Sequence, residues 1–368
     1  MSRVHLGDVA IEHKETCKED KSMYPIVGLE HLTPEQITLQ NWDLNTENTF
    51  TKVFRKGNIL FGRRRAYLKK AAVAPFDGIC SGDITVIEAK EDKIIPELLP
   101  FVIQNDDLFD FAVGKSAGSL SPRVKWTHLQ NYEFELPDKP KQYELAKVLW
   151  AIENTRKSYQ ELIKRTDELV KSQFIELFGD PIANDKGWET KPLKSVAPEC
   201  RPSIPKQERY WWLNLDMIES YSGYVVAKVY ESIENIGNST STFDDTMVLY
   251  SKLRPYLNKV IVPDDFGYAT TELVGLKPDE RVLNKYFLFN LIRGDQFVSY
   301  ANGLSAGGQM PRMPMKEMRN FQCILPPLEL QERFVEFYKQ SDKSKFELNR
   351  ALDELTATYK QIIKDNLG

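Results

Sequence analysis

Two long stretches of the chain carry apolar side chains at intervals of three, four or seven residues, and each predicts one long helix. The first covers Tyr143–Leu177, and Gly179–Pro181 follows it as a stop, because glycine accepts the left-handed cap conformation and proline cannot continue a helix. The second stretch covers Phe334–Ile362. A helix of about 38 residues is about 57 Å long. The apolar stripe is narrow and close to heptad spacing, which is typical of a coiled-coil seam.

The chain before each long helix has a mixed pattern of short apolar runs. Ile79–Ile87 alternates apolar and polar positions, which predicts strands. Leu98–Phe111 and Tyr286–Tyr300 have helical spacing. We therefore expect a mixed α and β domain in front of each long helix.

An internal repeat organises the whole chain. Leu60–Lys70 aligns with Leu249–Lys259 at an offset of 189 residues. The same offset, without a gap, aligns Gly78 with Gly267, Ser116–Gly118 with Ser305–Gly307, Pro122–Arg123 with Pro311–Arg312, Asn131 with Asn320, and Leu136–Pro137 with Leu325–Pro326. The chain is therefore two tandem copies of one unit, roughly residues 1–180 and 181–368.

The repeat also predicts how the long helices pair. Two equivalent units related by a two-fold axis would bring these helices together antiparallel, as in an isologous dimer made within one chain. Arg156 and Lys345 occupy the same seam position, where a polar residue commonly costs stability and fixes register. The alternative is two independent helices, each packed on its own domain.

The expected fold class is α+β, with two tandem α/β domains, two long antiparallel coiled-coil helices and pseudo-two-fold symmetry. The expected boundaries are a domain over residues 1–138, a helix over 139–180, a second domain over 181–326 and a second helix over 327–368. The predicted coiled-coil and subunit interface comprises Leu149, Ile152, Arg156, Tyr159, Ile163, Val170, Tyr338, Lys345, Leu348, Leu352, Leu355 and Tyr359.

Composition narrows the class of protein further. The 368 residues are 42% hydrophobic and 28% charged, which excludes wholesale disorder and a collagen-like chain. The 4 cysteines and 4 histidines lack metal-ligand spacing, so we expect neither a zinc site nor a disulfide scaffold. The N-terminus has no signal-peptide pattern, and no apolar run approaches the roughly 18 residues that mark a membrane span. We expect a cytoplasmic, reduced protein.

The formal net charge of −4 argues at first against a nucleic-acid ligand, but the local charge pattern favours one. Between Glu47 and Asp77 there is no acidic residue, whereas eight lysines and arginines occur. The corresponding window of the second copy, between Met247 and Asp264, again lacks acidic residues. Such a positive stripe suits phosphate contacts, and arginine also reads guanine edges.

The alternative interpretation of these windows is a solvated basic hairpin. Because two equivalent basic sites occur in one molecule, we favour DNA binding. The predicted DNA-binding residues are Arg63, Arg64, Arg65, Tyr67, Lys69, Lys70, Arg123, Lys125, Lys252, Arg254, Tyr256, Lys259 and Arg312.

Enzyme signatures are mostly missing from the sequence. It has no phosphate-binding loop, dinucleotide fingerprint, zinc-protease motif or nucleophile elbow, and no amine-holding motif of amino-methyltransferases. Asp83, Glu88 and Lys90 imitate the metal site of many nucleases, in which paired carboxylates and a lysine hold Mg²⁺ and orient a water molecule. The second copy scrambles this charge pattern, so a metal-dependent nuclease is the alternative hypothesis and a DNA-binding protein the main one. A coiled-coil scaffold without a DNA role is a third hypothesis.

Two phrases in the sequence resemble a known family. Asp167–Pro181, which ends in Phe-Gly-Asp-Pro, resembles the central conserved helix of type I restriction-modification specificity subunits. Leu325–Arg333, with its Leu-Pro-Pro-Leu-Glu-Leu-Gln phrase, resembles their second conserved region. The first copy departs from that phrase and keeps only Leu136, Pro137 and Gln142. The resemblance covers essentially the whole chain.

The resemblance implies a non-catalytic DNA-specificity subunit. Each domain would be a target recognition domain that reads one half of a bipartite site in double-stranded DNA, and the helices would fix the spacer between the halves. The helices would also dock two methylation subunits, to which restriction subunits attach. S-adenosylmethionine, ATP and Mg²⁺ would be bound by those partners, so no cofactor or metal is expected on this chain.

Overall fold

The computed structural model describes residues 2–18, 21, 23–44, 47–118, 120–305 and 308–368. The chain forms two compact units: unit 1 consists of Met1–Glu161 with Leu348–Gly368, and unit 2 of Leu162–Glu347. The border between the units therefore crosses both long helices, and the four-part division expected from the sequence stays a prediction. In the part of the chain that the structure describes, no helix has the length and apolar character needed to cross a membrane.

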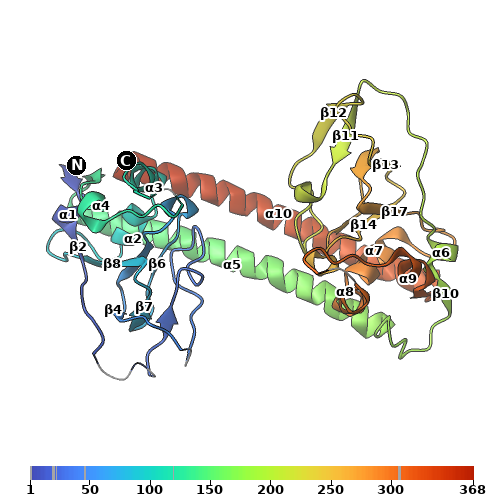
Figure 1. Cartoon of the computed structure of the whole chain (residues 1–368), viewed down its shortest axis with the longest axis horizontal. Helices are drawn as coiled ribbons and strands as arrows, with labels where there is room; N and C mark the ends of the chain where they lie inside the picture. The colour runs from blue at the N-terminus through green and yellow to red at the C-terminus, as the bar shows by residue number, and fades with distance from the viewer. Residues whose placement is uncertain (1, 19–20, 22, 45–46, 119, 306–307) are drawn as a thin grey trace. The chain divides into compact units, whose positions relative to one another are not determined.

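Unit 1 is built on three small sheets and several short helices (Figure 1). An antiparallel sheet has the order β2 (Ala10–Glu12), β8 (Ile84–Ala89), β5 (Ile59–Gly62), β6 (Ala71–Val73). A second sheet has the order β3 (Ile26–Val27), β7 (Gly78–Cys80), β4 (Lys52–Phe54), and β1 (Ser2–His5) pairs with β9 (Glu133–Leu136). The helical segments are α1 (Leu6–Val9), the 3-10 turn η1 (Ala66–Leu68), α2 (Leu99–Ile103), α3 (Asp106–Gly114) and α4 (Trp126–Leu129).

Unit 2 repeats this architecture. One sheet has the order β12 (Val229–Ser232), β11 (Arg209–Leu213), β16 (Gly267–Thr270), β13 (Thr240–Phe243), and another β15 (Val260–Ile261), β14 (Val248–Ser251), β17 (Leu273–Leu276). β10 (Thr190–Pro192) pairs with β18 (Gln322–Ile324). The helical segments are α6 (Leu193–Val196), the 3-10 turns η2 (Leu215–Met217) and η3 (Pro255–Leu257), α7 (Lys285–Arg293), α8 (Asp295–Leu304) and α9 (Met315–Asn320).

Two glycines show how closely the copies agree. Gly78 opens β7, which runs parallel to β3 and antiparallel to β4, and Gly267 opens β16, which pairs in the same way with β11 and β13. A β-carbon on Gly78 would lie 2.6 Å from the carbonyl oxygen of Pro25, and one on Gly267 would collide with the carbonyl oxygen of Trp211. Only glycine lets the neighbouring backbone come this close.

The predicted long helices are present and have equal length. α5 covers Lys139–Phe178 and α10 covers Leu328–Leu367, 40 residues each. α5 ends directly before Gly179, which has φ +72°, so the predicted stop is confirmed. Each helix begins a few residues earlier than its apolar stripe.

Each long helix packs into the core of both copies. In unit 1, Leu149 of α5 shares a core with Tyr359 of α10, whose ring lies 6.0 Å from that of Phe101. In unit 2, Phe174 of α5 contacts Phe334 of α10 at a ring separation of 5.3 Å. Two independent helices, each packed on its own domain, is therefore the wrong alternative.

Polar pairs occur at the seam position shared by the two copies. In unit 1, Arg156 bonds Glu153 at 3.0 Å and lies 5.5 Å from the centre of the Tyr359 ring. In unit 2, Lys345 Nζ lies 2.7 Å from Asp167 and 3.6 Å from Asp342. Asp167 of α5 thus meets Lys345 of α10, while Phe174, further along α5, meets the earlier Phe334 of α10, so the two segments run antiparallel in unit 2.

The predicted seam residues are all at least half-buried. Leu149, Val170, Tyr338, Lys345 and Tyr359 are buried. The remaining ones are half-buried, namely Ile152, Arg156, Tyr159, Ile163, Leu348, Leu352 and Leu355.

Both regions with helical spacing are helical, and each contains two helices. Leu98–Phe111 contains α2 and the start of α3, because Asn105 leaves the helical conformation and its side chain accepts a hydrogen bond from the N–H of Asp107. Tyr286–Tyr300 falls in α7 and α8, which Gly294 separates. Helical periodicity does not detect such a cap when apolar spacing continues across it.

A buried glutamine fixes the start of each long helix. Gln142 accepts a hydrogen bond from the N–H of Ile95 and donates one to the carbonyl oxygen of Pro137. Gln331 accepts from the N–H of Asn284 and donates to the carbonyl oxygens of Pro326 and Val282. These hydrogen bonds explain why the glutamine of the phrase occurs in both copies.

Candidate nucleic-acid interface

The same strained turn occurs at equivalent positions of the two units. In unit 1, Arg65 (φ +54°) and Lys69 (φ +50°) flank η1. In unit 2, Arg254 (φ +50°) and Asn258 (φ +47°) flank η3. A left-handed conformation costs a non-glycine residue on the order of 1–3 kcal/mol and persists where the surrounding structure enforces it, often at a functional site. The turn is therefore the candidate site.

The turn presents side chains to solvent at the end of a buried hairpin. β5 leads into η1 and β6 leads out of it, and all four residues of β5 are buried. Arg65 is exposed, and Tyr67 and Tyr256 are 54% and 40% exposed. Exposed arginine and tyrosine on a rigid hairpin suit contacts with a DNA backbone.

A second basic segment of each copy supports the turn. The N–H of Arg65 donates to the carbonyl oxygen of Pro122 at 2.8 Å, and the N–H of Arg254 donates to that of Pro311 at 2.7 Å. The backbones also pair at isolated bridges, which join Arg64 with Arg123 and Leu253 with Arg312. The two basic elements that the sequence shares between its copies are thus joined in space within each unit. The Ser-Ala-Gly element before them is described only in part, since Ala306 and Gly307 lie outside the described residues.

An acidic side chain holds the arginine of each supporting segment. Arg123 bonds Asp83 at 2.7 Å, and Arg312 bonds Glu272 at 3.1 Å. The hydrogen bond from Arg123 lowers the pKa of Asp83, and the charge of Arg64, 3.4 Å away, lowers it further. A guanidinium has five N–H donors, so each arginine keeps donors for a ligand while the carboxylate fixes its position.

Three of the predicted lysines use their ammonium groups within the protein. Lys70 donates to the carbonyl oxygen of Leu29, and Lys259 donates to that of Leu215. Lys69 pairs with Asp106 at 2.5 Å. Lys70 and Lys259 therefore anchor the strand after the turn, which is a structural reason for their presence in both copies.

The other predicted residues remain near the turn. Arg63 and Arg64 are half-buried, and Lys125 is exposed directly before α4. Lys252 and Arg254 of unit 2 are half-buried. The DNA-binding role of all thirteen residues stays a prediction.

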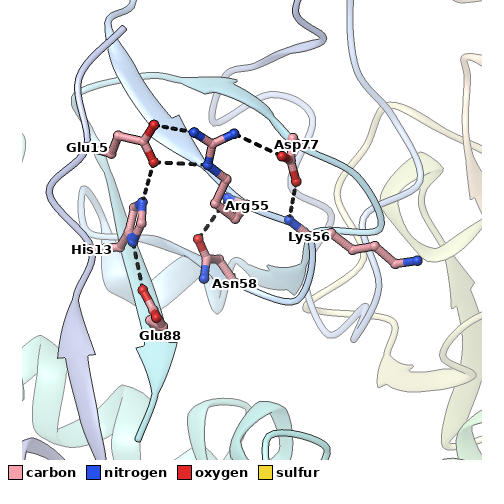
Figure 2. Close-up of polar contacts among 7 residues, drawn as sticks. All are labelled: His13, Glu15, Arg55, Lys56, Asn58, Asp77 and Glu88. Carbon is pink, nitrogen blue, oxygen red and sulfur yellow. Dashed lines mark hydrogen bonds and ion pairs between the residues drawn. The ribbon is translucent and has the colours of Figure 1, made fainter.

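The acid-free window of the sequence is partly neutralised in three dimensions. Figure 2 shows Arg55 between Glu15 and Asp77, two acids from outside the window or at its edge; its Nη1 lies 3.0 Å from Asp77. The hydrogen bond with Arg55 lowers the pKa of Glu15, which His13 also contacts at 3.1 Å. A count of charges along the chain misses this pairing.

A polar concavity of about 800 Å³ adjoins the turn of unit 1. Its walls come from five separate segments and carry four cationic side chains, two carboxylates and several hydroxyls. They are Lys14, Glu15, Thr16, Thr49, Phe50, Thr51, Lys52, Arg63, Ser81, Gly82, Asp83 and Arg123. Lys14 and Lys52 are candidate ligand contacts that the sequence alone did not single out.

The residues of the nuclease hypothesis do not converge. Asp83 bonds Arg123, Oε2 of Glu88 lies 2.7 Å from Nδ1 of His13, and Lys90 donates to the carbonyl oxygen of Gly7 at 2.6 Å. Over the described ranges, no group of three or more histidine, cysteine, aspartate or glutamate side chains has the arrangement to hold a metal ion. The structure gives the nuclease hypothesis no support.

Comparison with known proteins points to one family. The family model described as type I restriction modification DNA specificity domain matches this chain twice, over residues 3–165 and 185–356. The EcoDI type I restriction enzyme specificity subunit of Escherichia coli is 24% identical over 152 residues, which are 40% of this chain and 33% of that protein. The chain thus matches about a third of that relative's length.

Two further proteins match over most of the chain. A protein of Methanocaldococcus jannaschii, named as the specificity subunit of type I restriction enzyme MjaX, is 19% identical over 355 residues, 88% of this chain and 81% of that protein. The crystal structure of a type I restriction-modification system S subunit from M. genitalium superposes with a TM-score of 0.60 at 11% identity, covering 100% of this chain and 96% of that one. At this identity the likeness concerns the fold alone.

Proposed function

Because the chain belongs to the type I restriction modification DNA specificity domain family, we propose that it is the DNA-specificity subunit of a type I restriction-modification complex. Each unit would read one half of a bipartite target. The observation that carries this proposal is the doubled site: the same strained turn, supported by the same Pro-Arg segment and acid-held arginine, in both units. Two equivalent sites in one chain fit a DNA target that consists of two parts.

Arginines at the turn would supply phosphate or base contacts in this function. Arg65 and Arg254 have equivalent left-handed backbones. Glutamine removes the charge of either arginine and is not β-branched, so it is compatible with this conformation. Each exchange should lower the salt dependence of DNA affinity by about 0.9 in the slope of log K against log salt, and the double exchange by about 1.8. Equilibrium binding of the assembled complex to a target duplex measures this.

Two exposed arginines far from the turns serve as controls. Arg3 in unit 1 and Arg281 in unit 2 have side chains that are 76% and 87% exposed, and each pairs with a neighbouring acid. Arg3→Gln and Arg281→Gln should leave the slope unchanged. An unchanged slope in Arg65→Gln and Arg254→Gln would remove the turns from the interface.

The target itself is found by methylome sequencing of the host with and without this gene. We expect the lost methylation to mark a motif of two short parts with a non-specific spacer. A single uninterrupted motif would contradict the reading of two half-sites.

The long helices would set that spacer and dock the partners. α5 begins in unit 1 and ends in unit 2 as one continuous helix, so its length is a property that both units share. Inserting one helical turn within α5 should change the spacer length in the methylome without changing either half-site. A spacer that keeps its length would refute this role.

Catalysis would belong to partner subunits. We propose that two methylation subunits and the restriction subunits bind this chain and carry S-adenosylmethionine, ATP and Mg²⁺. Equilibrium dialysis of labelled S-adenosylmethionine should show binding to the complex and none to this chain alone. Binding to this chain alone would contradict the division of roles.

A further inference from the structure

We propose that the concavity of unit 1 is an anion pocket that takes one backbone phosphate of DNA, with Lys52 and Arg63 as its central contacts. This inference rests on the proposed function and adds to it a site outside the turns that distinguishes unit 1 from unit 2.

The carboxylates of the pocket are already engaged by other groups. Glu15 bonds Arg55 and His13, as Figure 2 shows, and neither of those two lines the pocket. Asp83 bonds Arg123 and Arg64. These pairs leave the pocket with Lys14, Lys52 and Arg63 as a positive excess.

Two of these cations lack an acidic partner among the described residues. Arg63 has a buried Nε atom without a hydrogen-bond partner. Lys52 donates to the carbonyl oxygen of Ile84 at 2.7 Å, which satisfies one of its three donors. Lys14 is 3.7 Å from Glu12, with a side chain that is 76% exposed.

The cations lie close enough to repel one another. Burial lowers the pKa of Lys52, the charges of Cys80 and Glu12 raise it, and the charges of Arg63 and Lys14 lower it. Like charges held together in a partly buried site repel one another, and a bound anion would add to the counter-charge that Glu12 supplies. The hydroxyls of Thr16, Thr49 and Thr51 on the same walls are further donors for phosphate oxygens.

The pocket also lies beside the proposed reading surface. Arg63 and Arg123 line it, and both belong to the segments that form and support the turn. A DNA backbone that contacts Arg65 therefore has a basic recess next to it. Lysine acts on phosphate as a point charge, which suits a contact that positions the duplex without reading its sequence.

Unit 2 offers a matched control at the same register. Phe54 pairs with Gly78 and Phe243 with Gly267, so Lys52 on β4 corresponds to Ser241 on β13. Unit 2 therefore has an uncharged residue where unit 1 has the half-buried Lys52.

The test compares Lys52→Met with Lys52→Arg and Ser241→Ala in the assembled complex on the target duplex. Lys52→Met should lower the slope of log K against log salt by about 0.9, the amount expected for one phosphate, and Lys52→Arg should restore it. Ser241→Ala should leave it unchanged. An unchanged slope in Lys52→Met overturns the inference.

Thermal unfolding without DNA separates this role from a structural one. If Lys52 serves a ligand, Lys52→Met should unfold at the same temperature as the native protein or higher, because it removes a buried charge. If Lys52→Met clearly loses stability and Lys52→Arg does not restore the slope, the lysine is structural and the inference is overturned. Lys14→Met, which changes an exposed side chain, provides a second variant whose slope should also fall.

Inorganic phosphate distinguishes the source of the anion. Phosphate should raise the unfolding temperature of the native protein above that in potassium chloride of equal ionic strength, and Lys52→Met should abolish this difference. A phosphate effect combined with an unchanged DNA slope would mean that the pocket takes a free anion, which overturns the assignment to DNA.

If Arg65→Gln lowers the slope and Lys52→Met does not, this inference fails and the proposed function stands; if the complex does not bind DNA, both fail.

Discussion

The turn of unit 1 and the turn of unit 2 share a backbone and differ in charge. Both have left-handed residues on either side of the 3-10 turn and the same support from a Pro-Arg segment. Yet Arg64 and Lys69 of unit 1 correspond to Leu253 and Asn258 of unit 2. Lys70 and Lys259, which both copies retain, anchor the same frame, whereas Arg64 and Lys69 pair with acids of unit 1 and have no charged counterpart in unit 2.

The largest expected effects concern Gly78 and Gly267, the equivalent glycines of the two units. Gly267→Ala should be the most destabilising change, at about 3 kcal/mol or more, because its β-carbon meets the backbone of Trp211 and a backbone shift is unavoidable. Gly78→Ala should cost less, since its β-carbon would lie farther from the nearest backbone atom, the carbonyl oxygen of Pro25. Urea denaturation of both variants measures the free energy of unfolding. Equal costs, or a larger one for Gly78→Ala, would show that the two close approaches are not governed by these neighbours.

The glutamines at the starts of the two long helices differ in the number of backbone groups that they bind. Gln331 satisfies three backbone groups and Gln142 two, so Gln331→Ala should cost about 3 kcal/mol and Gln142→Ala about 2, at roughly 1 kcal/mol for each buried group left unpaired. Urea denaturation again provides the measurement. The reverse order would mean that water replaces the lost bonds in unit 2.

The polar seam pairs differ in what their removal leaves behind. Arg156→Met leaves Glu153, whose side chain is 5% exposed, with the longer ion pair to Lys157 at 3.8 Å, whereas Lys345→Met leaves two aspartates that are 40% exposed. Since a poorly paired buried charge costs more than an exposed one, we expect about 2 kcal/mol for Arg156→Met and about 1 kcal/mol for Lys345→Met.

The pH dependence of Arg156→Met provides a further test. Burial already raises the pKa of Glu153, and losing Arg156 should raise it more. A carboxyl with a folded pKa above its unfolded value binds more protons in the folded state, so the stability of Arg156→Met should rise as the pH falls through that folded pKa. Unfolding temperatures between neutral and mildly acidic pH measure this. A stability that decreases as the pH falls through this range would contradict the role of Glu153.

The sequence predicts those features that depend on patterns along the chain, and it misses those that depend on contacts between distant residues. The long helices, their stop at Gly179 and their packing across copies followed from periodicity and from the repeat, both of which are visible along the chain. The caps at Asn105 and Gly294 did not, because apolar spacing continues through them. The site shows the same division: basic windows located the turns, but the inward direction of Lys70 and the neutralisation of Arg55 depend on partners that only the fold brings close.

The smallest expected effect concerns the acids that hold the supporting arginines. Asp83 pairs with Arg123 and Arg64, whereas the ion pair of Glu272 is with Arg312, so Asp83→Asn should cost about 1 kcal/mol and Glu272→Gln less, as partly exposed pairs contribute little. The pKa of Asp83 is lowered in the folded state. Its contribution is therefore present above the unfolded pKa of about 3.9 and is lost as the pH falls through the folded value. The difference in unfolding temperature between the native protein and Asp83→Asn should accordingly be largest near neutral pH and shrink toward pH 3. A difference that stays constant with pH would mean that Asp83 stabilises its neighbours by shape rather than by charge. Its pair with Arg123 would then contribute no more charge stabilisation than the pair of Glu272 with Arg312.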